Sequence, residues 1–132
     1  MFSNEKARKI LEGLLEKTRA NQVNWRLPTM LESDDWQDAT SFILRLPESS
    51  VFVEFKSPLV DPDRYVIEFY NKNDVIVKKL IIEEGDPSWE LAQSLYGEAG
   101  RVAVGWDQVL VDIEKAVGSP GQIGLSADQL RE

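Results

Sequence analysis

The stretch TSFILRLPESSVFVEFK, residues 40–56, indicates the fold more directly than any other part of the sequence. Apolar residues recur at every second position on both sides of a short turn: Thr40, Phe42, Leu44, Leu46, then Val51, Val53, Phe55. Such alternation is typical of strands with one buried face, and the turn Pro47-Glu48-Ser49 is short enough to join antiparallel neighbours. The stretch therefore predicts a β-hairpin.

Two further strand patterns follow this hairpin. Tyr65, Ile67 and Phe69 alternate with more polar positions, whereas the run VIVKKLIIEE (75–84) changes its apolar parity near its centre. We expect either a β-bulge at Lys78-Lys79 or a switch of the buried face there. The connecting segments are rich in turn-forming residues, which suits antiparallel neighbours. The sequence thus predicts a four-stranded meander with one face open to solvent.

Helical patterns flank the sheet on both sides in the sequence. Residues 4–19 carry apolar residues at helical spacing, and we expect that helix to stop near Asn21. Asp86-Pro87 is typical of a helix start, with Asp as the capping residue and Pro at the first helical position. We expect Gly97 and Gly100 to let this second helix lie close to the sheet.

A third and last helix is predicted after Gly105, which we expect to end the second one. Asp107 is the expected capping residue of the last helix. The residues that we expect to face inward share one side of that helix: Val109, Leu110, Ile113, Ala116, Val117. The predicted fold class is α+β, with an N-terminal helix, a four-stranded antiparallel β-meander and two C-terminal helices packed on one face of the sheet.

The domain organisation follows from length and composition. A chain of 132 residues fits one domain by the usual length prior. We place that single α+β domain at residues 1–117. Residues 118–132 are rich in glycine and poor in apolar residues, and we expect them to form a flexible C-terminal tail.

Composition excludes several function classes. The chain has no histidine and no cysteine, so it lacks the usual general base near neutral pH and the usual zinc ligands. A net charge of −8 argues against nucleic acid or an anionic membrane as partner. Neither a secretory signal nor a membrane-spanning run is visible, so we expect a cytoplasmic protein. We also expect no cofactor and no metal.

One polar stretch, LESDDWQD (31–38), has the composition of a binding surface. Four carboxylates surround a single tryptophan, and the residues concerned are Glu32, Asp34, Asp35, Trp36, Asp38. The acids lack the ligand spacing of a calcium loop. An aromatic side chain ringed by carboxylates fits an interface anchor that binds a basic partner. Burial of Trp36 in the core and a plain solvated loop are the alternatives.

The order of the features carries one resemblance. A first helix containing LLEKT (14–18), a tryptophan at position 25, a strand meander, a helix with SLYGEAGRVAVG (94–105) and a short closing helix follow one another. Over residues 8–117 this order resembles that of a loose group of small bacterial proteins of unknown function. The resemblance implies the fold and a bacterial origin, and it carries over no activity and no functional residue.

Taken together, these features favour a non-enzymatic, acidic protein-interaction module of the adaptor, regulatory or immunity type. Its partner would be another protein, of basic character, and the sequence does not fix the oligomeric state. The alternative is a small-ligand-binding protein or an enzyme that uses carboxylates near the open sheet face or in the loop 61–63. Two acids that converge beside an apolar pocket would favour this alternative.

Overall fold

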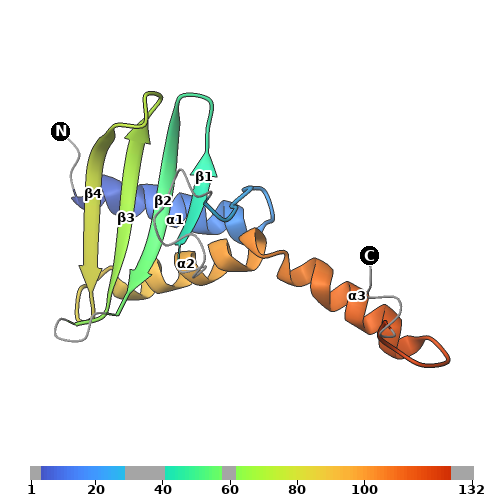
Figure 1. Ribbon diagram of the computed structural model, residues 1–132. Helices are drawn as coiled ribbons and strands as arrows, with labels where there is room; N and C mark the ends of the chain where they lie inside the picture. The colour runs from blue at the N-terminus through green and yellow to red at the C-terminus, as the bar shows by residue number, and fades with distance from the viewer. Residues whose placement is uncertain (1–3, 29–40, 58–61, 126–132) are drawn as a thin grey trace.

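A computed structural model describes residues 4–28, 41–57 and 62–125. Its elements, in chain order, are α1 (Asn4–Arg19), β1 (Ser41–Arg45), β2 (Ser49–Lys56), β3 (Arg64–Asn71), β4 (Ile76–Glu83), α2 (Trp89–Ala103) and α3 (Trp106–Gly118). The predicted α+β class is confirmed: one helix, a four-stranded antiparallel sheet and two C-terminal helices follow one another (Figure 1).

The sheet is the predicted meander, with strand order β1-β2-β3-β4 and antiparallel pairing throughout. Its one irregularity lies between β3 and β4. Phe69 pairs with Lys78 and Tyr70 pairs with Ile76, so Val77 is the additional residue. The bulge that we placed at Lys78-Lys79 is therefore present one residue earlier. From the bulge onward, alternate residues of β4 turn toward the helices and are the less exposed ones, ending with the buried Ile82.

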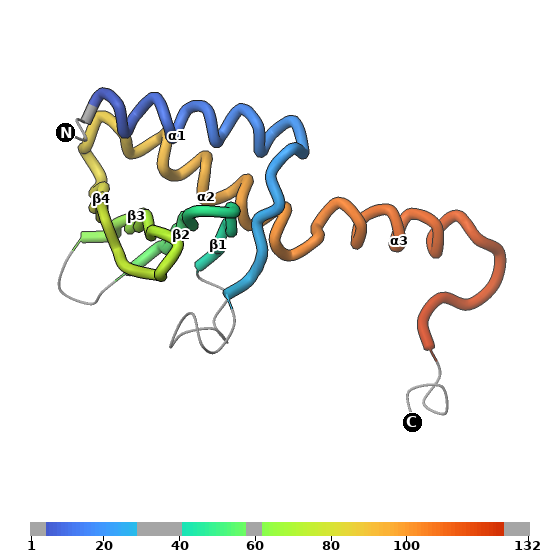
Figure 2. Tube along the Cα trace, turned by 90° about the horizontal axis from the view of Figure 1, so that it is seen from above, coloured from blue at the N-terminus to red at the C-terminus, as the bar shows by residue number. Residues whose placement is uncertain are grey.

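The core lies between the sheet and the helices. Seen from above, α2 runs across one sheet face and α1 lies alongside α2 (Figure 2). Ala92, Leu95 and Ala99 of α2 are fully buried. The sheet residues that pack in the same cluster are alternate positions of the four strands: Phe42, Leu44, Val51, Val53, Tyr65, Ile67, Ile82. Phe42, Leu44, Val51, Val53, Tyr65 and Ile67 are positions that the alternation predicted to be buried, whereas Leu46 of the same pattern is 47% exposed.

Only one of the two helix glycines permits a close approach. A Cβ built on Gly100 would lie 2.9 Å from the Cζ atom of Phe42, so the helix backbone rests directly on that ring. Gly97 is exposed and has nothing within 4 Å of the same position. The expectation is confirmed for Gly100 and wrong for Gly97, because Gly97 lies on the solvent side of α2, nearly opposite the buried Ala92, Leu95 and Ala99.

The opposite face of the sheet is less open than predicted. Ile43, Phe52 and Val66 are buried there, although α1 and α2 cover the other face. The expectation of one open face was wrong at the centre of the sheet because β1, β2 and β3 carry apolar residues on both faces. Solvent reaches this face near its edge, where half of Ile81 is exposed.

The chain after α1 closes one end of the core. Asn21 has a φ of 59° and ends the helix where predicted. Trp25 is buried, and its indole N–H donates a hydrogen bond to the hydroxyl of Thr18 at 3.0 Å. Arg26 then pairs with Ile43 through two backbone hydrogen bonds of 2.9 Å and extends the edge of the sheet. Trp25 thus covers the end of α1.

The two C-terminal helices begin differently from the prediction. Asp86 accepts a hydrogen bond from the backbone N–H of Ser88, and helix α2 begins only at Trp89. Gly105, with a φ of 69°, precedes the first residue of α3, and Asp107 makes no capping hydrogen bond. Asp107 is instead the partner of an arginine of α2. This pair directs α3 away from the sheet.

Candidate functional site

The predicted acidic surface lies outside the described residues. Its members, Glu32, Asp34, Asp35, Trp36 and Asp38, all belong to the range 29–40. Their role as a partner-binding set, and the choice between an anchoring and a buried Trp36, stay predictions. A candidate site must therefore be built from residues that the sequence reasoning had not selected.

The carboxylates on the sheet face opposite the helices are engaged with their neighbours. Glu54 pairs with Lys56 at 3.4 Å, and Glu68 pairs with Lys79 at 3.9 Å. Glu68 also accepts a hydrogen bond of 2.9 Å from the hydroxyl of Tyr70. Burial, then the hydrogen bond and charge of Glu68, raise the pKa of Tyr70 to about 12, so its hydroxyl stays protonated at neutral pH. These groups hold one another in place.

The loop before β3 is a second acidic set that the sequence suggested. Asp61 lies outside the described residues. Asp63 accepts a hydrogen bond of 2.6 Å from the hydroxyl of Ser57, across the base of the loop. Across residues 4–28, 41–57 and 62–125, no three acidic side chains come together in an arrangement that could hold a metal ion.

A groove of about 580 Å³ lies between α1, β4 and the turn that precedes α2. Its floor includes Leu11 and Ile82, which belong to the core. Arg8 reaches across its end, donating to the carbonyl of Pro87 at 3.2 Å and lying 3.4 Å from the hydroxyl of Ser88. The groove offers apolar surface, and its charged lining residues are Arg8, Glu5 and Asp86.

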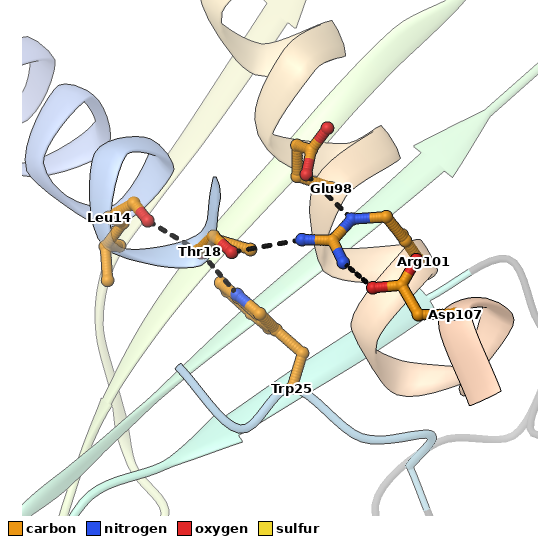
Figure 3. Close-up of polar contacts among 6 residues, drawn as sticks. All are labelled: Leu14, Thr18, Trp25, Glu98, Arg101 and Asp107. Carbon is orange, nitrogen blue, oxygen red and sulfur yellow. Dashed lines mark hydrogen bonds and ion pairs between the residues drawn. The ribbon is translucent and has the colours of Figure 1, made fainter. Parts of the chain in front are cut away.

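A polar joint connects the ends of three helices (Figure 3). The guanidinium of Arg101 donates to Glu98 at 2.9 Å, to the backbone carbonyl of Thr18 at 3.2 Å, and to Asp107. The hydrogen bond to Glu98, with the charges of both carboxylates, raises the pKa of Arg101. One side chain thus binds the last turn of α1, its own helix α2 and the first turn of α3.

Thr18 gives this joint its fixed base. It is fully buried, and its hydroxyl donates to the carbonyl of Leu14 at 2.6 Å while it accepts from Trp25. Its backbone carbonyl lies in the last turn of α1, where carbonyls lack the usual partner within the helix. It accepts from the backbone N–H of Asn21 at 3.0 Å and also from Arg101. The direction in which α3 leaves the molecule is therefore set by specific contacts, together with the left-handed backbone at Gly105.

Helix α3 projects beyond the sheet and buries none of its residues (Figures 1 and 2). With about 100° between successive residues, its apolar side chains gather on one side of the helix. We call this set the apolar stripe; it consists of Trp106, Val109, Leu110, Ile113, Ala116 and Val117. The large residues of the stripe are 38–68% exposed. Within the described part of the molecule, no other helix presents such a face to solvent.

The expectation that this side of the last helix faces inward was wrong. The periodicity correctly identified the apolar side, but the main contact of α3 among the described elements is with α2 and not with the sheet. Trp106, the first residue of α3, does not pack on the sheet either, since half of its surface is exposed. The signal in the sequence was a glycine placed directly between two helical patterns. Its φ of 69° permits a change of direction as well as a stop.

Acidic side chains border the apolar stripe on both sides. Measured around the helix axis, Glu114 lies about 40° beyond one edge and Asp112 about 40° beyond the other. Asp107, next to Glu114 on the same border, is paired with Arg101. Lys115 lies on the side of the helix opposite the stripe. The combination of an apolar centre and an acidic border is typical of a surface that binds another macromolecule.

Comparison with known protein families, with curated proteins and with solved structures gives no significant match. None of the helices in the described ranges is long and apolar enough to cross a membrane. The function must therefore be inferred from the geometry of this chain.

Proposed function

We propose that this protein is a non-enzymatic, acidic interaction module that binds another protein through helix α3. The observation that carries the proposal is the exposure of the apolar stripe on a helix whose base is tied to the rest of the molecule by the Arg101 joint. Exposed contiguous apolar patches on soluble proteins commonly mark interaction sites. A helix that lays its apolar face on a partner is a recurrent mode of recognition.

The absence of histidine and cysteine supports a binding role, because it removes the commonest catalytic groups. In the described ranges, Glu54 and Glu68 form ion pairs and Asp63 accepts a hydrogen bond, which supports a binding role further. An adaptor, regulatory or immunity-type protein of the bacterial cytoplasm would need this kind of binding helix. The acidic stretch 31–38 would then be a second contact surface for the same partner.

The proposal is tested by photo-crosslinking in the cells that express the chain. A benzophenone amino acid at position 113 lies in the apolar stripe, and the same group at Gln93 lies on the exposed side of α2. We expect an adduct of defined mass from position 113 and none from position 93. Absence of adducts from positions 110, 113 and 117 alike would rule out α3 as a binding element.

The groove between α1 and β4 supports a second candidate function, the binding of a small ligand. Its volume of about 580 Å³ lies within the usual range of ligand sites, about 300–1,000 Å³. An apolar dye should then bind the folded chain, and Leu80→Trp, which fills the groove, should abolish the binding. Dye binding that disappears with Ile113→Asp instead would assign the apolar surface to α3.

A further inference from the structure

The charges that border the apolar stripe restrict what can bind it. Asp112 and Glu114 lie on opposite sides of the stripe, and in the part of the chain that the structure describes neither has an ion-pair partner. Lys115, the one base of α3, lies on the far side of the helix. Any helix that is laid along the stripe therefore has carboxylates at both of its edges.

A second copy of this chain is a poor occupant for this surface. If two α3 helices paired through their stripes, Asp112 and Glu114 of each copy would lie at the edges of the same interface. Like charges that face each other across an interface cost binding free energy and suppress wrong partners. The whole chain also carries a net charge of −8, which opposes the approach of two copies.

We propose that the occupant is a cationic amphipathic helix of another protein, in which an apolar face is bordered by lysine or arginine. This inference rests on the proposed function and adds the chemistry of the partner to it. The apolar residues of the partner would cover Trp106, Leu110 and Ile113. Its basic residues would pair with Asp112 and Glu114 at the two edges.

The joint at the base of α3 adds to the specificity. Asp107 shares a border with Glu114, but it is paired with Arg101, which also pairs with Glu98. Among the described residues of α3, the carboxylates that remain without an ion-pair partner, Asp112 and Glu114, lie farther along the helix. A partner helix should place its basic residues there and its largest apolar residue near the half-exposed Trp106.

The size of the surface sets the expected strength. A helix of 13 residues is about 20 Å long at 1.5 Å per residue. Pairing it with one helix buries about 1,000 Å² in total, which is at the low end for specific complexes. The interaction should therefore be transient and salt-sensitive, since exposed charge pairs weaken as ionic strength rises.

The experiment uses the full chain and a labelled 14-residue peptide of leucine and lysine, with leucines at helical spacing. One control peptide has the same composition in an order that breaks the spacing, and a second has glutamate in place of lysine. Binding is followed by fluorescence anisotropy at low and at high salt. We expect the leucine–lysine peptide to bind at least about tenfold more tightly than either control.

Matched variants of the protein locate the binding surface. Ile113→Asp and Val111→Asp add the same charge to residues of similar exposure, 51% and 43%, but only Ile113 belongs to the stripe. We expect Ile113→Asp to weaken binding about tenfold or more and Val111→Asp to change it less than about threefold. Asp112→Asn with Glu114→Gln should weaken binding and flatten its salt dependence. Circular dichroism confirms that each variant is folded, and Ile113→Asn replaces Ile113→Asp if that variant is not.

Four outcomes would overturn the inference. Equal binding of the leucine–glutamate peptide would show that charge does not select the partner. Equal losses in the Ile113 and Val111 variants would show attraction to the acidic chain as a whole. A dimer in sedimentation equilibrium that Ile113→Asp dissociates would assign the stripe to a second copy. If the leucine–lysine peptide does not bind while the crosslink from position 113 persists, the basic character of the partner is wrong and the proposed function stands. If neither the peptide binding nor the crosslink is observed, both the inference and the proposed function are wrong.

Discussion

Helices α2 and α3 follow one another in the chain, have similar lengths of 15 and 13 residues, and both carry an apolar side. Their surroundings are opposite. The apolar side of α2 packs against the sheet, and Leu95 is fully buried there. Helix α3 buries none of its residues. The comparison teaches that helical periodicity reports the presence of an apolar face but not the surface that covers it.

The largest test of this comparison removes one large side chain from each helix. Leu95→Ala should lower the free energy of unfolding by about 2–5 kcal/mol, because it removes fully buried atoms and leaves a cavity. Ile113→Ala should lower it by less than about 1 kcal/mol, since the side chain is half exposed. Urea denaturation measures both. A cost above about 2 kcal/mol for Ile113→Ala would mean that α3 packs on the body in solution.

A second test concerns the buried polar contacts of the packed region. Thr18→Val keeps the shape of the side chain but removes the acceptor of the Trp25 indole N–H. A buried donor without a partner costs about 1–3 kcal/mol, and urea denaturation should show a loss of this size. Trp25→Phe removes buried atoms and lowers stability in either background, but its cost should be smaller by about 1 kcal/mol in the Thr18→Val background, where the indole N–H has already lost its partner. Additive losses would show that the hydrogen bond contributes nothing to stability.

The two glycines of α2 provide a smaller and opposite pair of effects. Gly100→Ala places a methyl group against the ring of Phe42, which is itself buried, so overpacking of about 1–3 kcal/mol should outweigh the gain in helix propensity. Gly97→Ala meets no atoms and should stabilise by up to about 1 kcal/mol. Thermal unfolding of both variants measures the two changes in stability. Stabilisation by Gly100→Ala would show that α2 can move away from the sheet.

The smallest expected effect comes from removing α3 altogether. A chain that ends at Gly105 loses no buried residue of α3, and Arg101 keeps its contacts to Glu98 and Thr18. We expect a loss below about 1 kcal/mol, comparable to that of an exposed ion pair. Differential scanning calorimetry of the shortened and the full chain makes the comparison. A fall in melting temperature of more than about 10 °C would mean that α3 is part of the folded unit.

Much of the fold was predictable because local patterns determine it. The alternation in residues 40–56 specified β1 and β2 and the side that faces the helices, and the bounds of α1 were predicted to the residue. The position of the bulge was missed by one residue, because the parity of apolar residues in β4 does not show which one lacks a partner across the sheet. Burial of Phe52 and Val66 was missed because we expected only one buried face, whereas their strands are apolar on both faces.

The candidate site was less predictable, for a physical reason. The apolar stripe of α3 was read correctly from its spacing, but its exposure depends on the backbone at Gly105 and on the pairing of Arg101 with Asp107. Both are relations between two elements, and neither has a periodic signature. The carboxylates around Trp36 were chosen from composition alone, and their binding role stays a prediction.

The Arg101 joint also gives α3 the mechanics of a lever. With a length of about 20 Å, a rotation of about 10° at Gly105 moves the far end by about 3.5 Å and leaves Trp106 almost in place. The stripe is therefore presented most accurately at its base and least accurately near Val117. A partner that contacts the base loses little orientational freedom, whereas one that contacts only the tip must first immobilise the helix. Weakening the contact between Arg101 and Asp107 would thus weaken binding of the partner, although no residue of the apolar stripe is changed.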